Sequence, residues 1–459
     1  MSEKNVNTIG KDFTFGQLVK FVAAPVVSKI AISLLQTIDD GLFMSRYVGQ
    51  DALSAFSIAL PWFMFVDAFG MMISTISVKC SVLMGEKKND QANSYFTTIS
   101  LVSVGIGAFF SLILTLFRKK ILILLGATDV LLPYALQYMN VSRFYTPMVM
   151  LSYIFTRFFV IAGKPKLSVA STLTTTFCNF FFDWLFIVKL NIGVVGAAYA
   201  NLIGYTAATL IGIFFYGDKN QEVHFAKPVK EWFKLTVSVC RLGFSQFLTS
   251  LSVSVNCYIS NIVLLAYGKE GGVAAYTIVN NVTFMLMNGY WGLFDSASPV
   301  ASYAYGERNA KKLAKSFKQI TWLTTLLTAI IITGFVISKN TIINMYLGTS
   351  DNKEVYDMVV YGMKFVPYIF IVFGYNVMVQ TLSLSVGNEK ITTILSTLEN
   401  VIFANLAIIL LPKIFGLDGV WYAFLVGELL ALIFSLYAVY ANRDVYGYGK
   451  KKIATFTQF

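Results

Sequence analysis

Apolar stretches of about 20 residues recur along the whole chain, and short polar segments separate them. A helix rises about 1.5 Å per residue, so each stretch is long enough to cross the hydrocarbon core of a bilayer. The stretches lie at 15–38, 53–80, 97–117, 133–161, 167–188, 194–216, 240–266, 274–302, 319–338, 358–385, 391–412 and 418–441. This pattern predicts an all-α polytopic membrane protein with twelve transmembrane helices.

The second half of the chain repeats the first. The segment SVLMGEKKND from Ser81 returns 221 residues later as SYAYGERNAK from Ser302, and GVVGAAYANLIG from Gly193 returns 223 residues later as GLDGVWYAFLVG from Gly416. Each copy contains six spans, so both copies enter the membrane from the same side. We therefore expect two six-helix lobes related by a pseudo-two-fold axis along the membrane normal, an architecture typical of secondary transporters.

A polar stretch between the two copies marks a linker, and it contains the only histidine, His224. We predict an N-terminal six-helix lobe at 1–217, a cytoplasmic linker at 218–239, a C-terminal six-helix lobe at 240–441 and a cytoplasmic tail at 442–459. We interpret His224 as a solvated loop residue rather than a pH sensor. A proton relay through histidines inside the bundle is excluded by their absence from the spans.

Composition and charge fit this picture. Hydrophobic residues make up 56% of the chain and charged residues 13%, and the mean hydropathy is +0.66, which is outside the range of soluble proteins. With a cytoplasmic N-terminus, the inside segments hold 21 lysines and arginines and the opposite loops hold nine. This bias predicts a multi-pass protein of the cell membrane with both termini in the cytoplasm.

The net charge of +12 raises the question of nucleic-acid binding. The basic residues are scattered over short loops and form no continuous stripe, so we expect no nucleic-acid partner and assign the charge to anionic lipid headgroups. The four cysteines lie in or at the ends of spans, without CxxC or metal-ligand spacing, so we expect neither a disulfide nor a metal site. They are Cys80, Cys178, Cys240 and Cys257.

Acidic residues inside the spans are the candidate functional groups, because an ionised carboxylate at mid-membrane costs at least about 2.5 kcal/mol. Burial disfavours the charged form, so such a group can bind a proton near neutral pH and release it when a cation approaches. The candidates are Asp67, Asp183, Asp295, Glu399 and Glu428.

Two structural interpretations of these acids stay open. The carboxylates can form ion pairs with basic residues that also fall within spans, namely Lys29, Arg143 and Lys364. A single acid such as Glu399 or Glu428 is also often only hydrogen-bonded to a neighbouring helix. Uncharged polar residues in the spans either line a cavity or hold helices together, and they are Asn179, Asn256, Asn280, Asn281, Asn376 and Gln380.

Several motifs resemble the MATE family of multidrug and toxic compound exporters. The segment CNFFFDWLFIVKLNIGVVGAAYAN, with Asn179 and Asp183 four residues apart, is similar to the family pattern around the fifth and sixth spans. The loops GEKKNDQA and YGERNAKK, the GKPK after the fourth span and the FGLDGVW before the twelfth also match. The resemblance extends from about Phe15 to Tyr440.

The resemblance implies two lobes, a central cavity and alternating access driven by sodium or protons. On that basis Asp40 matches the family's outer acid of helix one and Asp183 its helix-five acid. Asp295, four residues before Pro299, matches the helix-eight acid of the bacterial branch that includes the staphylococcal multidrug exporter, and Glu428 falls where that branch carries an acid. Other branches couple through acids in helices seven and ten, and those spans carry no Asp or Glu here, so the coupling ion is open.

These observations predict a secondary active antiporter that exports organic, cationic and amphipathic compounds in exchange for protons or sodium. Substrate and coupling ion would compete for the same acids, and that competition links the two fluxes. The predicted substrate- or ion-binding residues are Asp295, Asp183, Asp67, Asp40, Asn179 and Glu428. We expect no cofactor besides H⁺ or Na⁺, and a chain that functions as a monomer.

Two other classes were weighed. A flippase for lipid-linked oligosaccharides or lipids, from a related superfamily branch, would have additional spans and a more basic cavity; Lys29, Arg143 and Lys364 keep this alternative open. An intramembrane enzyme is disfavoured, because Asp39-Asp40 lacks the further acid of a DDxxD motif and Asp67 does not lie in a GxGD motif. We therefore predict that the chain is not an enzyme.

Overall fold

A computed structural model describes residues 8–43, 47–347 and 353–446, and the side chains of these residues apart from 36–42, 50 and 270. Within these residues the structure consists of helices and contains no strand. The helices are α1 (Phe15–Phe43), α2 (Gln50–Ser74), α3 (Ile76–Gly85), α4 (Asn89–Leu124), α5 (Leu132–Ile161), α6 (Pro165–Asp183), α7 (Val194–Gly217), α8 (Trp232–Gly306), α9 (Ala310–Leu347), α10 (Lys353–Gly362), α11 (Val366–Ser385), α12 (Glu389–Ser396), α13 (Ala404–Phe415) and α14 (Asp418–Ala441). The all-α prediction is confirmed.

Among the described residues, ten helices are long and apolar enough to cross a membrane, and they coincide with ten of the twelve predicted spans. The other two predicted spans, 167–188 and 274–302, are also helical: the first lies in α6 and the following turn, the second in α8 beyond a kink at Lys269. Both segments are rich in serine, threonine and asparagine, which lowers their hydropathy. The chain is therefore a multi-pass membrane protein.

The described residues form two compact units. The N-terminal unit contains the residues up to Asp12 together with Val27–Ser250, and the C-terminal unit contains Phe13–Val26 together with the residues from Leu251 onwards. Thus α1 and α8 each contribute one part to each unit. The predicted limits of the lobes, linker and tail stay a prediction.

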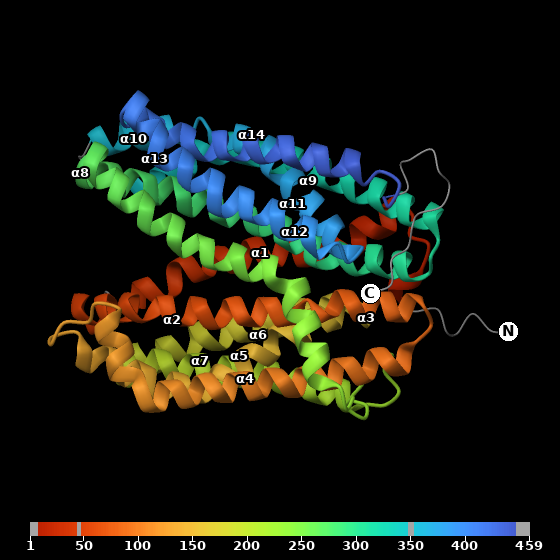
Figure 1. The fold of residues 1–459 in the computed structure, drawn as a ribbon. Coiled ribbons are helices and arrows are strands. Elements are labelled where there is room, and N and C mark those ends of the chain that lie inside the picture. The colour runs from red at the N-terminus through yellow and green to blue at the C-terminus, as the bar shows by residue number, and fades with distance from the viewer. Residues whose placement is uncertain (1–7, 44–46, 348–352, 447–459) are drawn as a thin grey trace. The chain divides into compact units, whose positions relative to one another are not determined.

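In the N-terminal unit α5 is the central helix and packs against α2, α4, α6 and α7 (Figure 1). Small residues bring these helices close together: a methyl group added at Gly107 of α4 would lie 2.5 Å from the Cα of Pro147 in α5. The first part of α8 docks on the same unit, because Lys79 donates a 2.9 Å hydrogen bond to Ser238. Such close approach is typical of helices that associate within a membrane.

In the C-terminal unit α11 packs between α9 and α14, and α13 packs on α14 (Figure 1). Gly374 of α11 leaves room for the ring of Tyr290 in α8, whose hydroxyl lies 2.8 Å from that of Thr328 in α9. Gly292 of α8 lies against Pro25 of α1, where an added methyl group would come 2.7 Å from the Pro25 carbonyl oxygen. These contacts hold the second part of α8 in the centre of its unit.

The segment between α7 and α8 is hydrogen-bonded to α4 rather than free in solvent. The backbone amides of Ala226 and Val229 donate to the hydroxyls of Thr97 and Thr98, at 2.8 and 2.9 Å. His224 is partly buried, and its Nδ1 lies 3.3 Å from Nδ2 of Asn93. The interpretation of His224 as a solvated loop residue is therefore wrong, because buried polar groups of α4 provide its partners.

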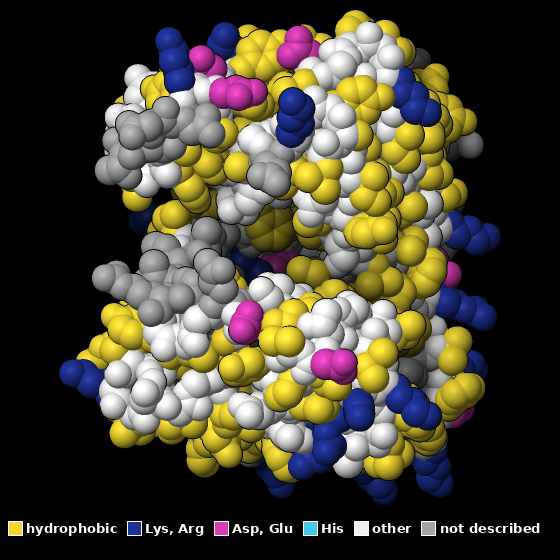
Figure 2. Space-filling view, turned by 90° about the vertical axis from the view of Figure 1, so that its left-hand side faces the viewer, with side chains coloured by type: hydrophobic (Ala, Val, Ile, Leu, Met, Phe, Trp, Pro, Cys, Tyr) yellow, Lys and Arg dark blue, Asp and Glu magenta, His cyan; other side chains and the backbone are white. Residues whose placement is uncertain are grey.

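Hydrophobic side chains cover much of the surface that faces the viewer in Figure 2. The exposed fraction is 76% for Phe214 in α7 and 78% for Ile337 in α9. Large apolar side chains exposed in this number are expected where lipid rather than water surrounds the helices. The four cysteines are free thiols.

Candidate ion and substrate site

Asp67 in α2 lies inside the helix bundle of the N-terminal unit and is partly buried. Its carboxylate accepts a hydrogen bond from the hydroxyl of Tyr153 in α5. Gly70, one turn further along α2, makes this contact possible, because an added methyl group would lie 2.6 Å from Cδ2 of the Tyr153 ring. Arg157, one turn after Tyr153, interacts electrostatically with that tyrosine. The structure thus gives the predicted acid a partner on a neighbouring helix.

A series of aromatic rings continues from this carboxylate through the N-terminal unit. Tyr205 of α7 interacts with Tyr153 and stacks on Tyr145, with ring centroids 5.8 Å apart. Tyr145 in turn stacks on Phe63, with centroids 6.4 Å apart. Aromatic faces carry partial negative charge, so rings beside a carboxylate suit an organic cation. Sequence analysis gave no single aromatic residue this role.

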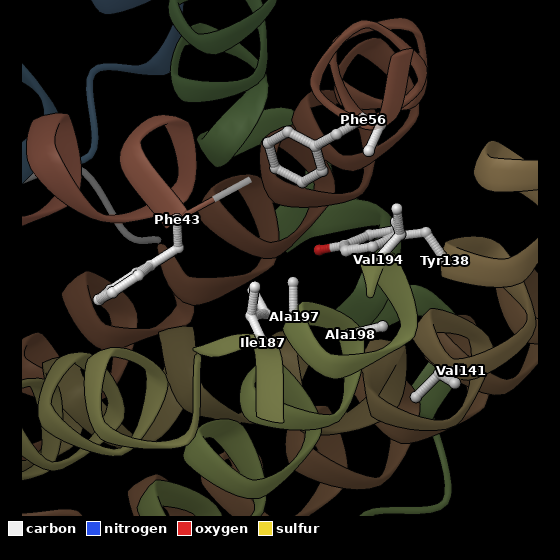
Figure 3. Close-up of a cluster of buried hydrophobic side chains, with 9 residues drawn as sticks. Phe43, Phe56, Tyr138, Val141, Ile187, Val194, Ala197 and Ala198 are labelled. Carbon is white, nitrogen blue, oxygen red and sulfur yellow. The ribbon is translucent and has the colours of Figure 1, made fainter. Parts of the chain in front are cut away.

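The series ends at Tyr138, whose hydroxyl lies 3.2 Å from that of Tyr145 and accepts a 3.3 Å hydrogen bond from Asn201. Tyr138 belongs to a buried apolar cluster with Phe43, Phe56, Val141, Ile187, Val194, Ala197 and Ala198 (Figure 3). Its ring meets the edge of Phe56 at 5.2 Å. In Figure 3 its oxygen points toward the side of the cluster formed by Phe56 and Ala197. A polar group is therefore built into an otherwise apolar cluster.

Asp183 is the last residue of α6 and is 1% exposed. A π-helical turn, η4 (Trp184–Lys189), follows it directly. Such turns are frequent at functional sites, because they alter the direction of the neighbouring side chains. Asn179 lies one turn earlier, so the two side chains share a face of α6. Asp40 belongs to the part of α1 whose side chains lie outside the described residues.

The C-terminal unit contains a second group of buried polar side chains. Asn376 in α11 donates through Nδ2 to Oε2 of Glu428 in α14, at 2.8 Å. Gln380, one turn further along α11, donates through Nε2 to Oε2 of Glu399, at 2.6 Å. Each glutamate is 4% exposed, and the two carboxyl groups interact electrostatically. The structure therefore joins the predicted site residue Glu428 to Glu399, which was not among the predicted site residues.

Glu399 could not have been ranked from sequence, because it lies in a second π-helical turn, η5 (Thr397–Phe403). The spacing of Asn376 and Gln380 was the available signal: residues four apart on α11 present two amides on one face. Asp295 is partly buried in the second part of α8, between Tyr290 and Ser298, both of which contact α11.

Two of the basic residues considered as ion-pair partners have other contacts. The Arg143 guanidinium lies 4.8 Å from the centre of the Phe144 ring and contacts the hydroxyl of Thr115. The Lys364 ammonium lies 5.4 Å from the ring centre of Tyr361. These contacts place both cations beside aromatic rings, where a cation is attracted by the ring face.

Comparison with known families fits this arrangement. The MatE family profile matches residues 25–185 and again 246–409, so the two matches begin 221 residues apart. The chain belongs to the MatE family. The predicted resemblance and the internal duplication are confirmed. Members of this family are transporters that need no cofactor, which also confirms that the chain is not an enzyme.

Relatives of this MatE chain cover nearly its whole length. It is 23% identical to the multidrug export protein MepA of Staphylococcus haemolyticus (strain JCSC1435) over 428 residues, which are 92% of each protein. It is also 23% identical to MepA of Staphylococcus aureus (strain bovine RF122 / ET3-1) over 453 residues, 97% of each. In structure it is similar to an outward-facing multidrug resistance MATE family transporter of the MOP superfamily, with a TM-score of 0.87, 19% identity and coverage of 96% of this chain and 98% of that one.

Proposed function

We propose that this protein is a secondary active antiporter of the cell membrane, which exports organic, cationic and amphipathic compounds in exchange for protons or sodium by alternating access. The observation that carries the proposal is the Asp67 carboxylate, which is held by Tyr153 beside a series of aromatic rings inside the bundle of a MatE chain. A negative charge next to ring faces suits a flat organic cation, and a carboxylate also binds a proton or Na⁺. The name of the staphylococcal relatives, multidrug export protein, supports the substrate class.

The architecture that we propose has twelve spans in two six-helix lobes, with both termini in the cytoplasm and one chain as the functional unit. The ten apolar helices, the two less apolar helical segments at 167–188 and 274–302, and the duplicated family match support it. Six spans per copy make the two copies parallel, with an axis along the membrane normal.

Exchange follows from competition at the acids. A carboxylate that binds either the organic cation or the coupling ion must release one before it takes the other, so the two fluxes are linked. In the N-terminal unit we assign this role to Asp67, and to Asp183 with Asn179 and Asp40. In the C-terminal unit we assign it to Asp295 and Glu428. An exchange of one monovalent cation for one proton moves no net charge, so a second titrating acid is required for the membrane potential to contribute.

Transport of ethidium into inverted vesicles, with proton and sodium gradients imposed separately, tests the proposal. We expect uptake to follow one of the two gradients and to fall about tenfold in Asp67→Asn, since the loss of one charged contact costs about 1.4 kcal/mol. Asp129→Asn is the matched control, because Asp129 is exposed in the segment between α4 and α5. If neither gradient drives ethidium, the multidrug assignment fails and lipid-linked oligosaccharides become the substrates to test.

A further inference from the structure

The glutamate pair of the C-terminal unit, Glu399 and Glu428, has too few hydrogen-bond donors for its acceptors. Asn376 uses Nδ2 for two bonds to one residue, the backbone oxygen of Glu428 at 2.9 Å and its Oε2 at 2.8 Å. Gln380 supplies one bond to Oε2 of Glu399. One oxygen of each carboxyl group is therefore served by an amide, and the pair still requires a donor for the other oxygens.

Asn376 itself adds a further acceptor. The residue is 0% exposed, and its Oδ1 is buried without a hydrogen-bond donor in the described structure. An unsatisfied buried acceptor costs about 1 to 3 kcal/mol. Such an atom on the amide that holds Glu428 indicates that the site lacks a positively charged or hydrogen-donating occupant.

The electrostatics of the pair point the same way. Two ionised carboxylates that interact inside a membrane bundle repel each other, and the low dielectric strengthens that repulsion. The hydrogen bonds that they receive come from neutral amides. Carboxyl groups held this close share a proton rather than ionise together, as in the aspartic proteases.

Charged groups on the neighbouring elements are distant or negative. On α12 to α14 the other charged residues lie at least nine positions from the pair along the chain, about 13 Å of helix, and are Glu389, Lys390, Lys413 and Asp418. No charged residue occurs in α11. From α8, which contacts α11 through Ser298, the titratable groups are Tyr290 and Asp295. The surroundings therefore supply amides, a phenol and a third acid.

We propose that Glu399 and Glu428, with Asn376 and Gln380, form a proton-binding site in the C-terminal unit, in which the two carboxyl groups share one proton. The proton forms an O–H bond to one carboxyl group and is donated as a hydrogen bond to the other. The use of this proton as the coupling ion rests on the proposed antiport, whereas its binding does not. The site would supply the second titrating acid that allows the membrane potential to contribute to export.

Infrared difference spectroscopy of the full-length protein in liposomes tests proton binding directly, without substrate. We expect a carboxylic-acid C=O band at neutral pH that disappears when the pH is raised, and that is absent from Glu399→Gln/Glu428→Gln. Glu354→Gln, at an exposed position of α10, is the matched control and should keep the band. A band that persists in the double variant, or no band in the wild type at neutral pH, would overturn the proposal.

A second variant guards against misfolding of the double substitution. Gln380→Met keeps the length of the side chain and removes the donor that stabilises ionised Glu399, so we expect the band to persist to higher pH. An unchanged titration would contradict the assignment. Adding NaCl in place of choline chloride at fixed pH should leave the band intact, and its loss would show that the site binds Na⁺ instead. Because the readout is binding, a failure of ethidium transport leaves this result interpretable.

Discussion

The hydroxyl of Tyr153 on α5 donates a hydrogen bond to the carboxylate of Asp67 on α2, so an acid inside the N-terminal unit is joined to a neighbouring helix. A hydrogen bond to a charged group contributes about 1.5 to 3 kcal/mol. The same contact favours the ionised carboxylate, which is the form that attracts an organic cation. The geometry of this pair therefore bears on substrate affinity.

Tyr153→Phe removes the donor and keeps the ring. We expect the affinity for ethidium at neutral pH to fall about tenfold, because a proton then competes better for Asp67. Raising the pH should restore part of the affinity, since the competing proton is removed. Fluorescence titration of the purified protein measures this effect. Tyr199→Phe, at an exposed tyrosine of α7, is the control. An equal loss of affinity at every pH would contradict the role assigned to the hydroxyl.

Gly70→Ala should disturb the same contact through packing. The added methyl group would meet Cδ2 of the Tyr153 ring at 2.6 Å, so the ring has to move away from α2. We expect ethidium transport to fall severalfold while the protein still inserts. Gly105→Ala is the matched control, because a methyl group there meets no atom within 4 Å and replaces a helical glycine, which stabilises a helix by about 1 kcal/mol. Equal transport by both variants would show that the ring position is unimportant.

The two acids of greatest interest differ in how far the sequence could predict them. Asp67 stood out because a carboxylate in the centre of an apolar span requires a reason, but its partner Tyr153 is 86 residues away and belongs to an ordinary-looking aromatic population. Glu399 was placed below Glu428, although the structure gives them equal burial. Its position depends on a π-helical turn, which no hydrophobic periodicity reveals.

The helices themselves were predictable because lipid requires long apolar segments whatever their partners. The length of two spans was the exception. Residues 167–188 and 274–302 carry many hydroxyl and amide side chains, and their helical state rests on packing inside the bundle as well as on hydropathy. The contacts of the linker with α4 were also missed, because Thr97 and Thr98 look like ordinary span residues until Ala226 and Val229 donate to them.

The linker contacts make a prediction of their own. Thr97→Val/Thr98→Val removes both hydroxyls that accept from the linker amides, and each hydrogen bond contributes about 1 kcal/mol. We expect trypsin to cut after the exposed Lys230 about tenfold faster, because the linker opens more often. Thr236→Val is the control, since that hydroxyl bonds to Trp232 within α8. Cleavage at the wild-type rate would mean that other contacts hold the linker.

Tyr216 near the end of α7 provides a test of the core of the N-terminal unit. It is 0% exposed, and its hydroxyl donates a 2.8 Å hydrogen bond to the carbonyl oxygen of Phe155 in α5. Its ring stacks on Phe159 with centroids 5.1 Å apart, so Tyr216→Phe keeps the packing and loses only the hydrogen bond. We expect a loss of about 1 kcal/mol and a fall of a few degrees in the apparent melting temperature in detergent.

Tyr216→Ala should lower the melting temperature far more, because it also leaves a cavity worth about 3 to 5 kcal/mol among the surrounding rings. The ratio of the two effects separates the hydrogen bond from the packing. If Tyr216→Phe destabilises as much as Tyr216→Ala, the hydroxyl rather than the ring joins α7 to α5. If neither variant changes the melting temperature, the contact between these helices does not limit the stability of the unit.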